Sequence, residues 1–281
     1  MKIDCHVHSY PLLMPGGLGK FSVITPYGGL RIDEVEDHLK KLEDKEGIIH
    51  GVFYGGNSIK TLPKRPTSKY LEKRVLPMIE NHLIQTIGVT SFDNLEPLYD
   101  FERCETQMRG IELLTKSDCF AIVDQPRPLY ERPKKETNRV SLKHRGEATV
   151  DELKSISKES KTKTFLCYSG MLFSKHRKDA EKVSKLTDLK LFGGSDTILR
   201  VGSLFSTYNN ANTEDIRDIL HNPGLIGRIN KGCSPWYNLE RVQRVGSAIK
   251  EEILGIEKRE SVHKQMVKEY LKNQESYNTN F

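Results

Sequence analysis

Two histidines two residues apart, His6 and His8, are the clearest chemical signal in the chain. The alternation of apolar and polar residues predicts a β-strand from Ile3 to Val7, with Asp4, His6 and His8 on one face and the odd-numbered residues on the other. Two imidazoles that leave the same face of a strand can bind one cation. They can equally be hydrogen-bonded histidines at the end of a sheet, so the remaining candidate ligands decide between the two interpretations.

Two carboxylates are candidate partners for these histidines. Glu112 lies inside the apolar run Gly110–Leu114, which we interpret as a strand, and a buried lone carboxylate is unfavourable unless a cation pairs with it. Asp196 follows the apolar run Leu191–Ser195, at the point where an α/β barrel presents its ligands. For Asp196 an N-cap or an Asx-turn is an equal alternative on local sequence. Glu112 and Asp196 are therefore the candidate carboxylates that could join the two histidines at a metal site.

Three further residues are candidates for a role next to this site. Tyr168 could donate a hydrogen bond to an oxyanion, or its ring could fill a pocket. Arg200 follows Asp196 by four residues and Lys116 follows Glu112 by four, so either cation could neutralise a phosphate. A solvated surface position is the alternative for each cation.

The elements that must position these residues alternate between helix and strand. We predict helices at 32–42, 67 or 68 to 83, 95–107, 150–160 and 179–187, and strands at 48–54, 86–90, 110–114, 119–123, 164–168 and 189–192. Short strands separated by helices of this length are typical of a parallel sheet, and six or seven such units favour closure into a barrel. The expected class is therefore α/β.

The barrel is expected to occupy residues 1–230. Residues 11–29 are rich in proline and glycine and are interpreted as a long loop, and the charged, proline-containing segment 125–146 as an exposed insertion. Residues 231–281 begin with Ser234 and Pro235, a helix-start signal, and are expected to form a C-terminal helical extension packed on the barrel.

Composition limits the classes of protein that fit. The chain has 281 residues, 44 basic and 38 acidic, with a net charge of +6, so nucleic acid is a permitted but not a favoured partner. Five scattered cysteines without a Cys-x-x-Cys pair argue against a disulfide framework or a zinc ribbon. No apolar run reaches the roughly 20 residues of a membrane span, so we expect a cytoplasmic protein. The oligomeric state does not follow from the sequence.

These residues resemble the polymerase and histidinol phosphatase (PHP) family over about Met1 to Arg228. The matching segments, in the family's order, are His6–His8, Met108–Glu112 and Gly193–Asp196 with Val201–Thr207. The resemblance implies a distorted (β/α)7 TIM-like barrel that binds up to three metal ions and often acts as a phosphoesterase. It also implies that Glu112 is the family's metal-bridging glutamate.

The sequence departs from the family at four ligand positions, which are occupied by Ser91, Phe92, Tyr168 and Ile198. By this mapping His6, His8, Glu112 and Asp196 enclose one of the family's ions, and the substituted positions serve the others.

The resemblance therefore implies one divalent ion, Zn²⁺, Mn²⁺ or Fe²⁺, that activates water for hydrolysis of a small phosphorylated substrate or a phosphodiester. A second hypothesis is a catalytically inactive PHP-like binding or scaffold protein whose pocket is filled by Phe92, Tyr168 and Ile198. A third is an amidohydrolase-like barrel, which also opens with His-x-His but needs a middle-strand histidine where Tyr168 stands.

Overall fold

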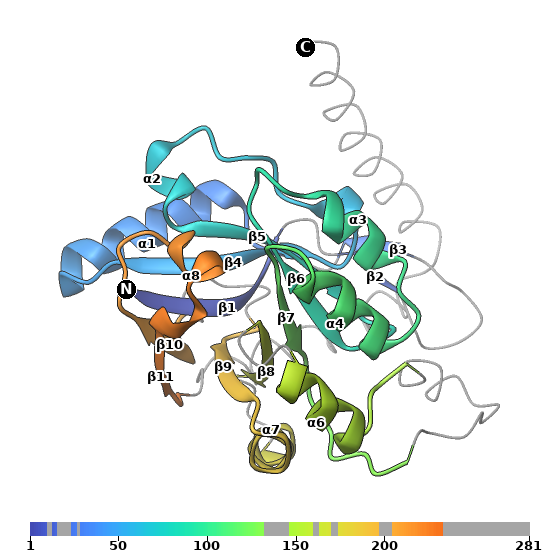
Figure 1. The fold of residues 1–281 in the computed structure, drawn as a ribbon. Coiled ribbons are helices and arrows are strands. Elements are labelled where there is room, and N and C mark those ends of the chain that lie inside the picture. The colour runs from blue at the N-terminus through green and yellow to red at the C-terminus, as the bar shows by residue number, and fades with distance from the viewer. Residues whose placement is uncertain are drawn as a thin grey trace, which may run out of the picture.

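The chain forms a mixed α/β fold around one large sheet (Figure 1). The structure is a computed structural model, and it describes residues 1–9, 13–15, 24–26, 29–131, 146–159, 163–169, 174–196 and 204–232. Among the helices in these ranges, none combines the length and apolar character needed to cross a membrane. The free cysteines in the same ranges are Cys5, Cys104, Cys119 and Cys167.

Nine strands make up the main sheet, in the spatial order β11-β10-β1-β4-β5-β6-β7-β8-β9. Their bounds are β1 Lys2–His8, β4 His50–Gly56, β5 Val75–Asn81, β6 Thr86–Val89, β7 Phe120–Val123, β8 Thr164–Ser169, β9 Lys190–Gly194, β10 Tyr208–Ala211 and β11 Ile226–Asn230. Strands β1, β4, β5, β7, β8 and β9 run in one direction, and β6 runs antiparallel between β5 and β7. The carboxyl ends of these six strands therefore lie at one end of the sheet.

The sheet curls into a nearly closed barrel because its last parallel strand returns to its first. The buried Asp4 carboxylate joins them: its Oδ1 accepts from the backbone N–H of Ser195 at 2.8 Å and of His6 at 3.2 Å, and its Oδ2 accepts from Phe205 N–H at 2.9 Å. Asn209 Oδ1 accepts from Gly193 N–H at 2.5 Å and links β10 to β9. The expected barrel-like α/β architecture is confirmed at this level.

The helices lie outside the sheet. Helices α1 Ile32–Glu46 and α2 Lys69–Glu72 cover β4 and β5, α3 Glu96–Glu102 and α4 Gln107–Thr115 cover β5 to β7, and α6 Val150–Glu159 and α7 Ser174–Thr187 lie along β8 and β9 (Figure 1). The smaller elements are η1 Ile59–Thr61, α8 Asp218–His221 and η3 Pro223–Leu225. Helix α1 ends at Gly47, whose left-handed φ of 65° and N–H bond to Glu43 form a C-cap.

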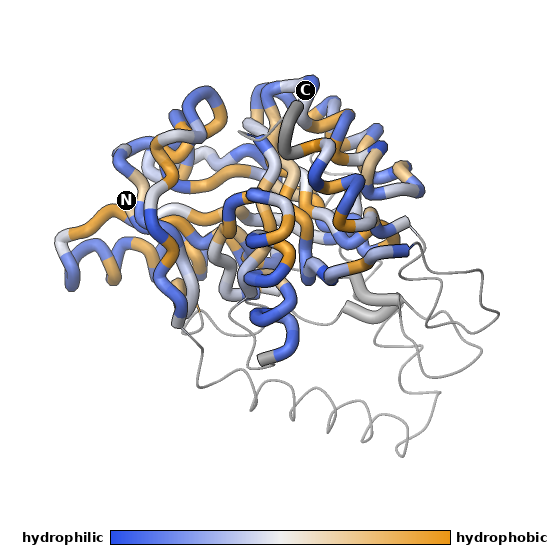
Figure 2. The backbone as a smooth tube through the Cα atoms, turned by 60° about the horizontal axis from the view of Figure 1, so that its bottom comes forward, coloured by the Kyte–Doolittle hydropathy of each residue, from blue (hydrophilic) through white to orange (hydrophobic). Residues whose placement is uncertain are grey.

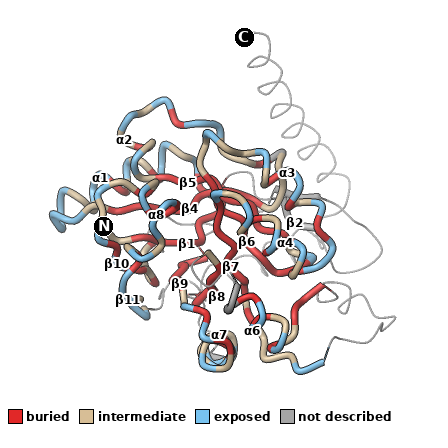
Figure 3. Tube along the Cα trace, in the orientation of Figure 1, coloured by how far each residue is buried: buried red, intermediate tan, exposed pale blue. Residues whose placement is uncertain are grey.

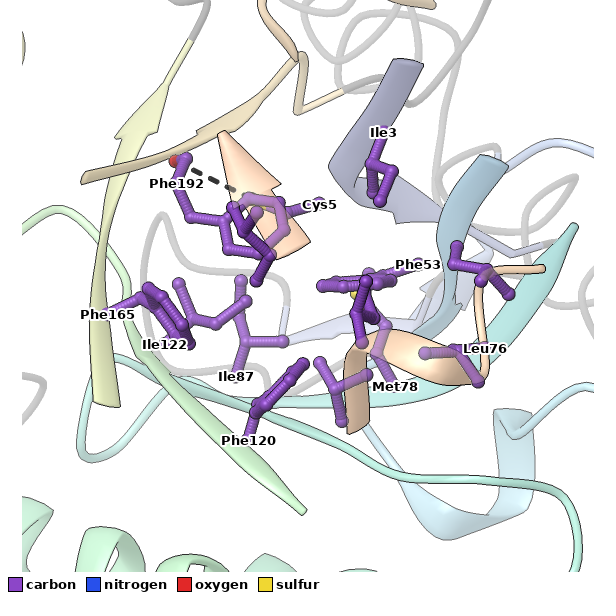
Figure 4. Packing of buried hydrophobic residues seen from close by; sticks show 14 of the residues in the cluster. Ile3, Cys5, Phe53, Leu76, Met78, Ile87, Phe120, Ile122, Phe165 and Phe192 are labelled. Atoms are coloured by element: carbon purple, nitrogen blue, oxygen red, sulfur yellow. Dashed lines mark hydrogen bonds between the residues drawn. The ribbon is translucent and has the colours of Figure 1, made fainter. Parts of the chain in front are cut away.

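Aromatic side chains fill the interior of the barrel (Figure 4). Phe192 packs on Phe53 and Phe165 with ring centroids 5.2 and 5.3 Å apart, and Phe165 packs edge-on against Phe120 at 5.4 Å. The strands are apolar and buried while the helices expose their polar faces, as Figures 2 and 3 show. The packed interior forms a floor beneath the carboxyl ends of the strands.

Two expected elements are wrong. The run Gly110–Leu114 is not a strand but part of helix α4, where Gln107, Gly110, Ile111 and Leu114 recur at helical spacing on the buried face. The helix expected to run from residue 67 or 68 to Leu83 stops at Glu72, and residues 75–81 form strand β5. Pro77 lacks the N–H that a helix interior needs, which favours the strand.

The remaining segment predictions fall partly outside the described residues. The expected loop 11–29 contains two paired short strands, β2 Leu13–Pro15 and β3 Ile24–Pro26. Residues 125–131 are described as turn and coil, and 132–145 of the expected insertion lie outside the described residues. The expected helical extension also lies outside them, apart from residues 231 and 232.

One irregularity in β1 changes which side chains point into the barrel. Asp4 aligns with Val52 and Val7 with Tyr54, so β1 has one more residue than β4 in this stretch. Cys5 belongs to the enclosed apolar cluster, whereas Val7 belongs to the cluster beneath α1. The expectation that these two residues share a face is therefore wrong, because the bulge reverses the alternation.

Removing the Asp4 carboxylate should weaken the closure of the barrel. We expect Asp4→Ala to lower the free energy of unfolding by about 3 kcal/mol or more, because two buried N–H groups and one half-buried N–H group lose their acceptor. Urea unfolding measures this change. Asp33→Ala, on the exposed first turn of α1, is the control and should stay within about 0.5 kcal/mol of wild type; equal effects of the two substitutions would contradict the role of Asp4.

Candidate metal centre

Imidazoles and carboxylates gather at the carboxyl ends of the parallel strands. His6 and His8 come from β1, Glu80 from β5, Asp124 directly follows β7, and Asp196 lies two residues beyond β9. All five side chains are buried. This end of a parallel sheet is where α/β barrels carry their functional residues.

The bulge in β1 is what aims both histidines inward. In a regular strand His6 would leave the face opposite to Cys5, away from the barrel interior. The extra residue brings both imidazoles to the inner side, where their ring centroids are 4.6 Å apart. The Asp4 carboxylate accepts from His6 N–H and so holds this bulge in place.

Four ligand-type atoms form the outer group of the cluster. His6 Nε2 lies 3.5 Å from Glu80 Oε2 and 3.9 Å from Asp196 Oδ1. His8 Nε2 lies 3.7 Å from the same Glu80 oxygen and is hydrogen-bonded to Asp196 Oδ1 at 3.1 Å. We call His6, His8, Glu80 and Asp196 the outer group.

A second set of atoms lies on the other side of the His6 ring. His6 Nδ1 is 3.8 Å from Asp124 Oδ1, and one ligand atom each from His6, Asp124 and Cys167 lie within 4.8 Å of one another. Both Asp124 oxygens are buried and make no hydrogen bond within the described part of the chain. We call His6 Nδ1, Asp124 and Cys167 the inner group.

Two backbone features place Asp196 and His6 against each other. A Cβ on Gly194 would lie 2.7 Å from His6 Cβ, so only glycine allows β9 to approach β1 this closely. Asp196 has a left-handed φ of 52°, a conformation that aspartate tolerates better than most residues. Strained backbone of this kind is concentrated at functional sites.

Buried negative charge dominates the electrostatics of the cluster. Burial favours the neutral acid, but the pKa of Glu80 is held well below its ordinary value by His82 and His6, and that of Asp196 is lowered by His6 and His8. Burial raises the pKa of Asp124, with Glu80 and Asp196 adding to the effect and His6 opposing it. Glu80 and Asp196 are therefore expected to be ionised.

The histidines respond to these acids in opposite directions. Burial alone would lower the pKa of His6, but Asp196, followed by Cys167, Glu80 and Asp124, holds it well above its ordinary value. Burial lowers the pKa of His8, and the charge on His6 adds to this effect while Asp196 opposes it. One imidazolium is the principal compensation for several buried acids, and a bound cation would provide more.

The nitrogen-to-oxygen spacing of the outer group is compatible with a divalent ion. Bonds of about 2.0–2.2 Å in a tetrahedron place neighbouring ligand atoms about 3.3–3.6 Å apart. The nitrogen-to-oxygen distances of 3.1–3.9 Å lie around that range. Both ring nitrogens of His6 are buried without a hydrogen bond to the described residues, as expected of a ligand awaiting an ion.

Glu112 does not belong to this cluster. It lies on the exposed face of α4, where its nearest charged neighbour is Arg109 at 3.9 Å. The prediction that it is a buried strand carboxylate is wrong, because the apolar residues around it follow the helical period and face the sheet while Glu112 faces solvent. His6, His8 and Asp196 are brought together as the sequence analysis expects.

The other candidate residues lie away from the cluster or outside the described residues. Tyr168 alternates with Cys167 along β8, and its ring lies on the opposite side of the strand, 4.9 Å from Lys231 Nζ. Lys116 is exposed at the end of α4. Phe92 packs against the cluster beneath α1, and Arg200 lies outside the described residues, as does Ile198.

Glu80 and Asp124 belong to the cluster but are not among the ligands predicted from the sequence. Glu80 lies in the segment that we expected to be helical, where a carboxylate followed by His82 gave no strand-end signal. His82 Nδ1 lies 2.7 Å from Glu80 Oε1. Asp124 directly follows a strand that was correctly expected, so it carried the same signal as Asp196.

Comparison with known proteins gives a fold and no function. No family model matches the sequence, and no curated protein matches it. The crystal structure of PsfC from Pseudomonas syringae PB-5123 is similar, with a TM-score of 0.50 and 11% identity over 87% of this chain and 98% of PsfC. At this identity the similarity concerns the fold alone.

The two glutamates provide a matched test of the site. We expect Glu80→Gln to weaken binding of Zn²⁺ or Mn²⁺ by at least about 10-fold, because a ligand matters at least as much as the groups that orient ligands. Glu112→Gln should bind like wild type. Isothermal titration calorimetry of metal-stripped protein measures both affinities, and a larger loss in Glu112→Gln would argue against this placement.

Proposed function

We propose that the chain is a metal-dependent hydrolase of PHP type that acts on a phosphate ester. The outer group would hold one divalent ion, Zn²⁺, Mn²⁺ or Fe²⁺, with Glu80 in the place first given to Glu112. The single observation that carries the proposal is that two imidazoles of β1 and the Glu80 carboxylate of β5 offer ligand atoms within 4.8 Å of one another in a buried site. Asp196, which follows β9, lies beside them and is hydrogen-bonded to His8. In this proposal the barrel is a variant of the distorted (β/α)7 barrel in which β6 is antiparallel.

The chemistry supplied by such an ion is the activation of water and the polarisation of a substrate oxygen. The chain's own residues orient the ligands. Asp196 is hydrogen-bonded to His8, and His82 lies against the second oxygen of Glu80, which fixes the direction of that carboxylate. The side chain of His82 is 22% exposed, so it can exchange a proton between the buried cluster and solvent.

Support for a phosphate ester as substrate comes from the resemblance in motif order. His-x-His lies at the end of the first strand and an aspartate follows β9, the last parallel strand, in the order of the PHP segments quoted above. In the structure, Glu80 and His82 lie at the carboxyl end of β5. The family mapping assigns a similar pair of positions to Ser91 and Phe92, which follow antiparallel β6 and therefore lie at the other end of the sheet. A small phosphorylated molecule or a phosphodiester is the substrate class proposed.

Metal removal should destabilise the folded protein. An ion that binds only the native state at 100 times its Kd adds about 2.7 kcal/mol to stability. We therefore expect thermal unfolding of the purified chain to shift to a lower temperature in a chelator and to recover when Zn²⁺ or Mn²⁺ is added. An unfolding temperature that changes neither in the chelator nor on addition of Zn²⁺ or Mn²⁺ would count against a bound ion.

Hydrolysis should depend on the outer group. We expect chromogenic phosphomonoesters or phosphodiesters to be hydrolysed, with His8→Ala and Asp196→Ala losing about 100-fold or more of the rate because each removes a metal ligand. His38→Ala, on helix α1, is the matched control and should retain the rate.

The same assay separates the alternative functions. An amide or lactone substrate in a parallel reaction tests for amidohydrolase-like chemistry. A folded, metal-loaded wild type that hydrolyses none of these substrates would reject the hydrolase proposal and leave the binding or scaffold protein.

A further inference from the structure

The inner group has the features of a second cation site. His6 Nδ1 faces Asp124, on the opposite side of the ring from the outer group, and Cys167 completes a set of three ligand atoms within 4.8 Å. All three side chains are buried. They come from β1, from the residue after β7 and from β8, so the rigid sheet itself fixes their positions.

Asp124 is the observation that points to a ligand. Its side chain is about 1% exposed, and neither carboxylate oxygen has a hydrogen-bond donor among the residues that the structure describes. His6 Nδ1 is 3.8 Å away, beyond hydrogen-bonding distance, and is equally without such a bond. Buried polar groups are ordinarily satisfied, so a cation bound by both side chains would account for this exception.

The thiol of Cys167 limits the kind of cation. Thiolate is a soft ligand that selects ions such as Zn²⁺ and Co²⁺, whereas Mg²⁺ prefers oxygen ligands. Cysteine, histidine and aspartate together are a donor set that zinc accepts in four-coordinate sites. The substituted PHP positions are occupied by other residues, so this site does not follow from the family resemblance.

We propose that His6 Nδ1, Asp124 and Cys167 form a second site that binds a thiophilic divalent ion beneath the outer group. Binding releases the thiol proton of Cys167 to solvent. When the outer ion is also bound through His6 Nε2, the His6 ring releases its remaining N–H proton and bridges the two ions. The inference shares His6 with the proposed function, but it requires neither hydrolysis nor occupancy of the outer group.

Cobalt titration of the full-length, metal-stripped protein tests this site. A thiolate ligand gives a near-ultraviolet sulfur-to-cobalt charge-transfer absorption that nitrogen and oxygen ligands do not give. We expect this absorption in wild type and its loss in both Cys167→Ser and Asp124→Asn. Cys119→Ser, which changes a buried thiol at the opposite end of β7, is the matched control and should keep it.

A further variant separates the two sites. Glu80→Gln should bind the outer ion at least about 10-fold more weakly and retain the charge-transfer absorption, so weakening of the outer site alone leaves the second site detectable. Cobalt bound to wild type without that absorption, or with the same absorption in Cys167→Ser, would overturn the second site while leaving the outer one standing. Circular dichroism checks that each variant is folded.

X-ray absorption of the zinc-loaded wild type needs no variant. A sulfur neighbour at about 2.3 Å from zinc is expected. A first shell of nitrogen and oxygen only would reject the proposal even if the substituted proteins failed to fold.

Discussion

A single buried carboxylate, that of Asp4, determines where the rest of the site can lie. Its three backbone hydrogen bonds reach the bulge in β1, the residue before Asp196 and the turn at Phe205. The bulge turns His6 and His8 inward, and the bond to Ser195 holds the strained backbone from which Asp196 projects. Burial raises the pKa of Asp4 to about 6 even though these hydrogen bonds favour its ionised form. The same carboxylate therefore both helps to close the barrel and positions the residues of the cluster.

The second constraint is electrostatic. Glu80, Asp124 and Asp196 are brought within a few ångströms of two imidazoles in a site with almost no solvent exposure. Buried charges without full compensation are strongly unfavourable, and the ion pairs of these acids within the described residues are all to histidines. Without a cation, the fold would bear the free-energy cost of burying these acids with only the histidines to compensate it. The proposed metal centre would account for the burial of these acids and for the Asp124 carboxylate, which has no hydrogen-bond donor among the described residues.

Many of the strands and helices could be predicted from the sequence. The wrong predictions for Glu112 and Glu80 share one cause, the confusion of a short strand with a helix. The β1 histidines, the strand β9 and Asp196 were identified because each apolar run ended at a polar residue. The environment of Glu112 was predicted wrongly because a run of only five residues does not separate a strand from one face of a helix, and tertiary packing decided for the helix. Glu80 was missed for the reverse reason, since a strand containing Pro77 followed a helix start at Ser68 without a turn signal.

The bulge in β1 could not have been predicted in the same way. Local alternation places Cys5 and Val7 on one face, and only the register against β4 shows the extra residue. The antiparallel direction of β6 is also a tertiary feature, and it places Ser91 and Phe92, which the resemblance maps to two substituted family ligand positions, at the other end of the sheet. Spacing along the chain therefore predicted the types of side chain in the cluster better than it predicted which residues provide them.

Anomalous diffraction from crystals of the zinc-loaded protein tests the metal centre most directly. The account predicts an anomalous peak within about 2.0–2.2 Å of His6 Nε2, His8 Nε2, Glu80 and Asp196. An empty cluster at saturating zinc, or a peak at exposed surface residues alone, would contradict it.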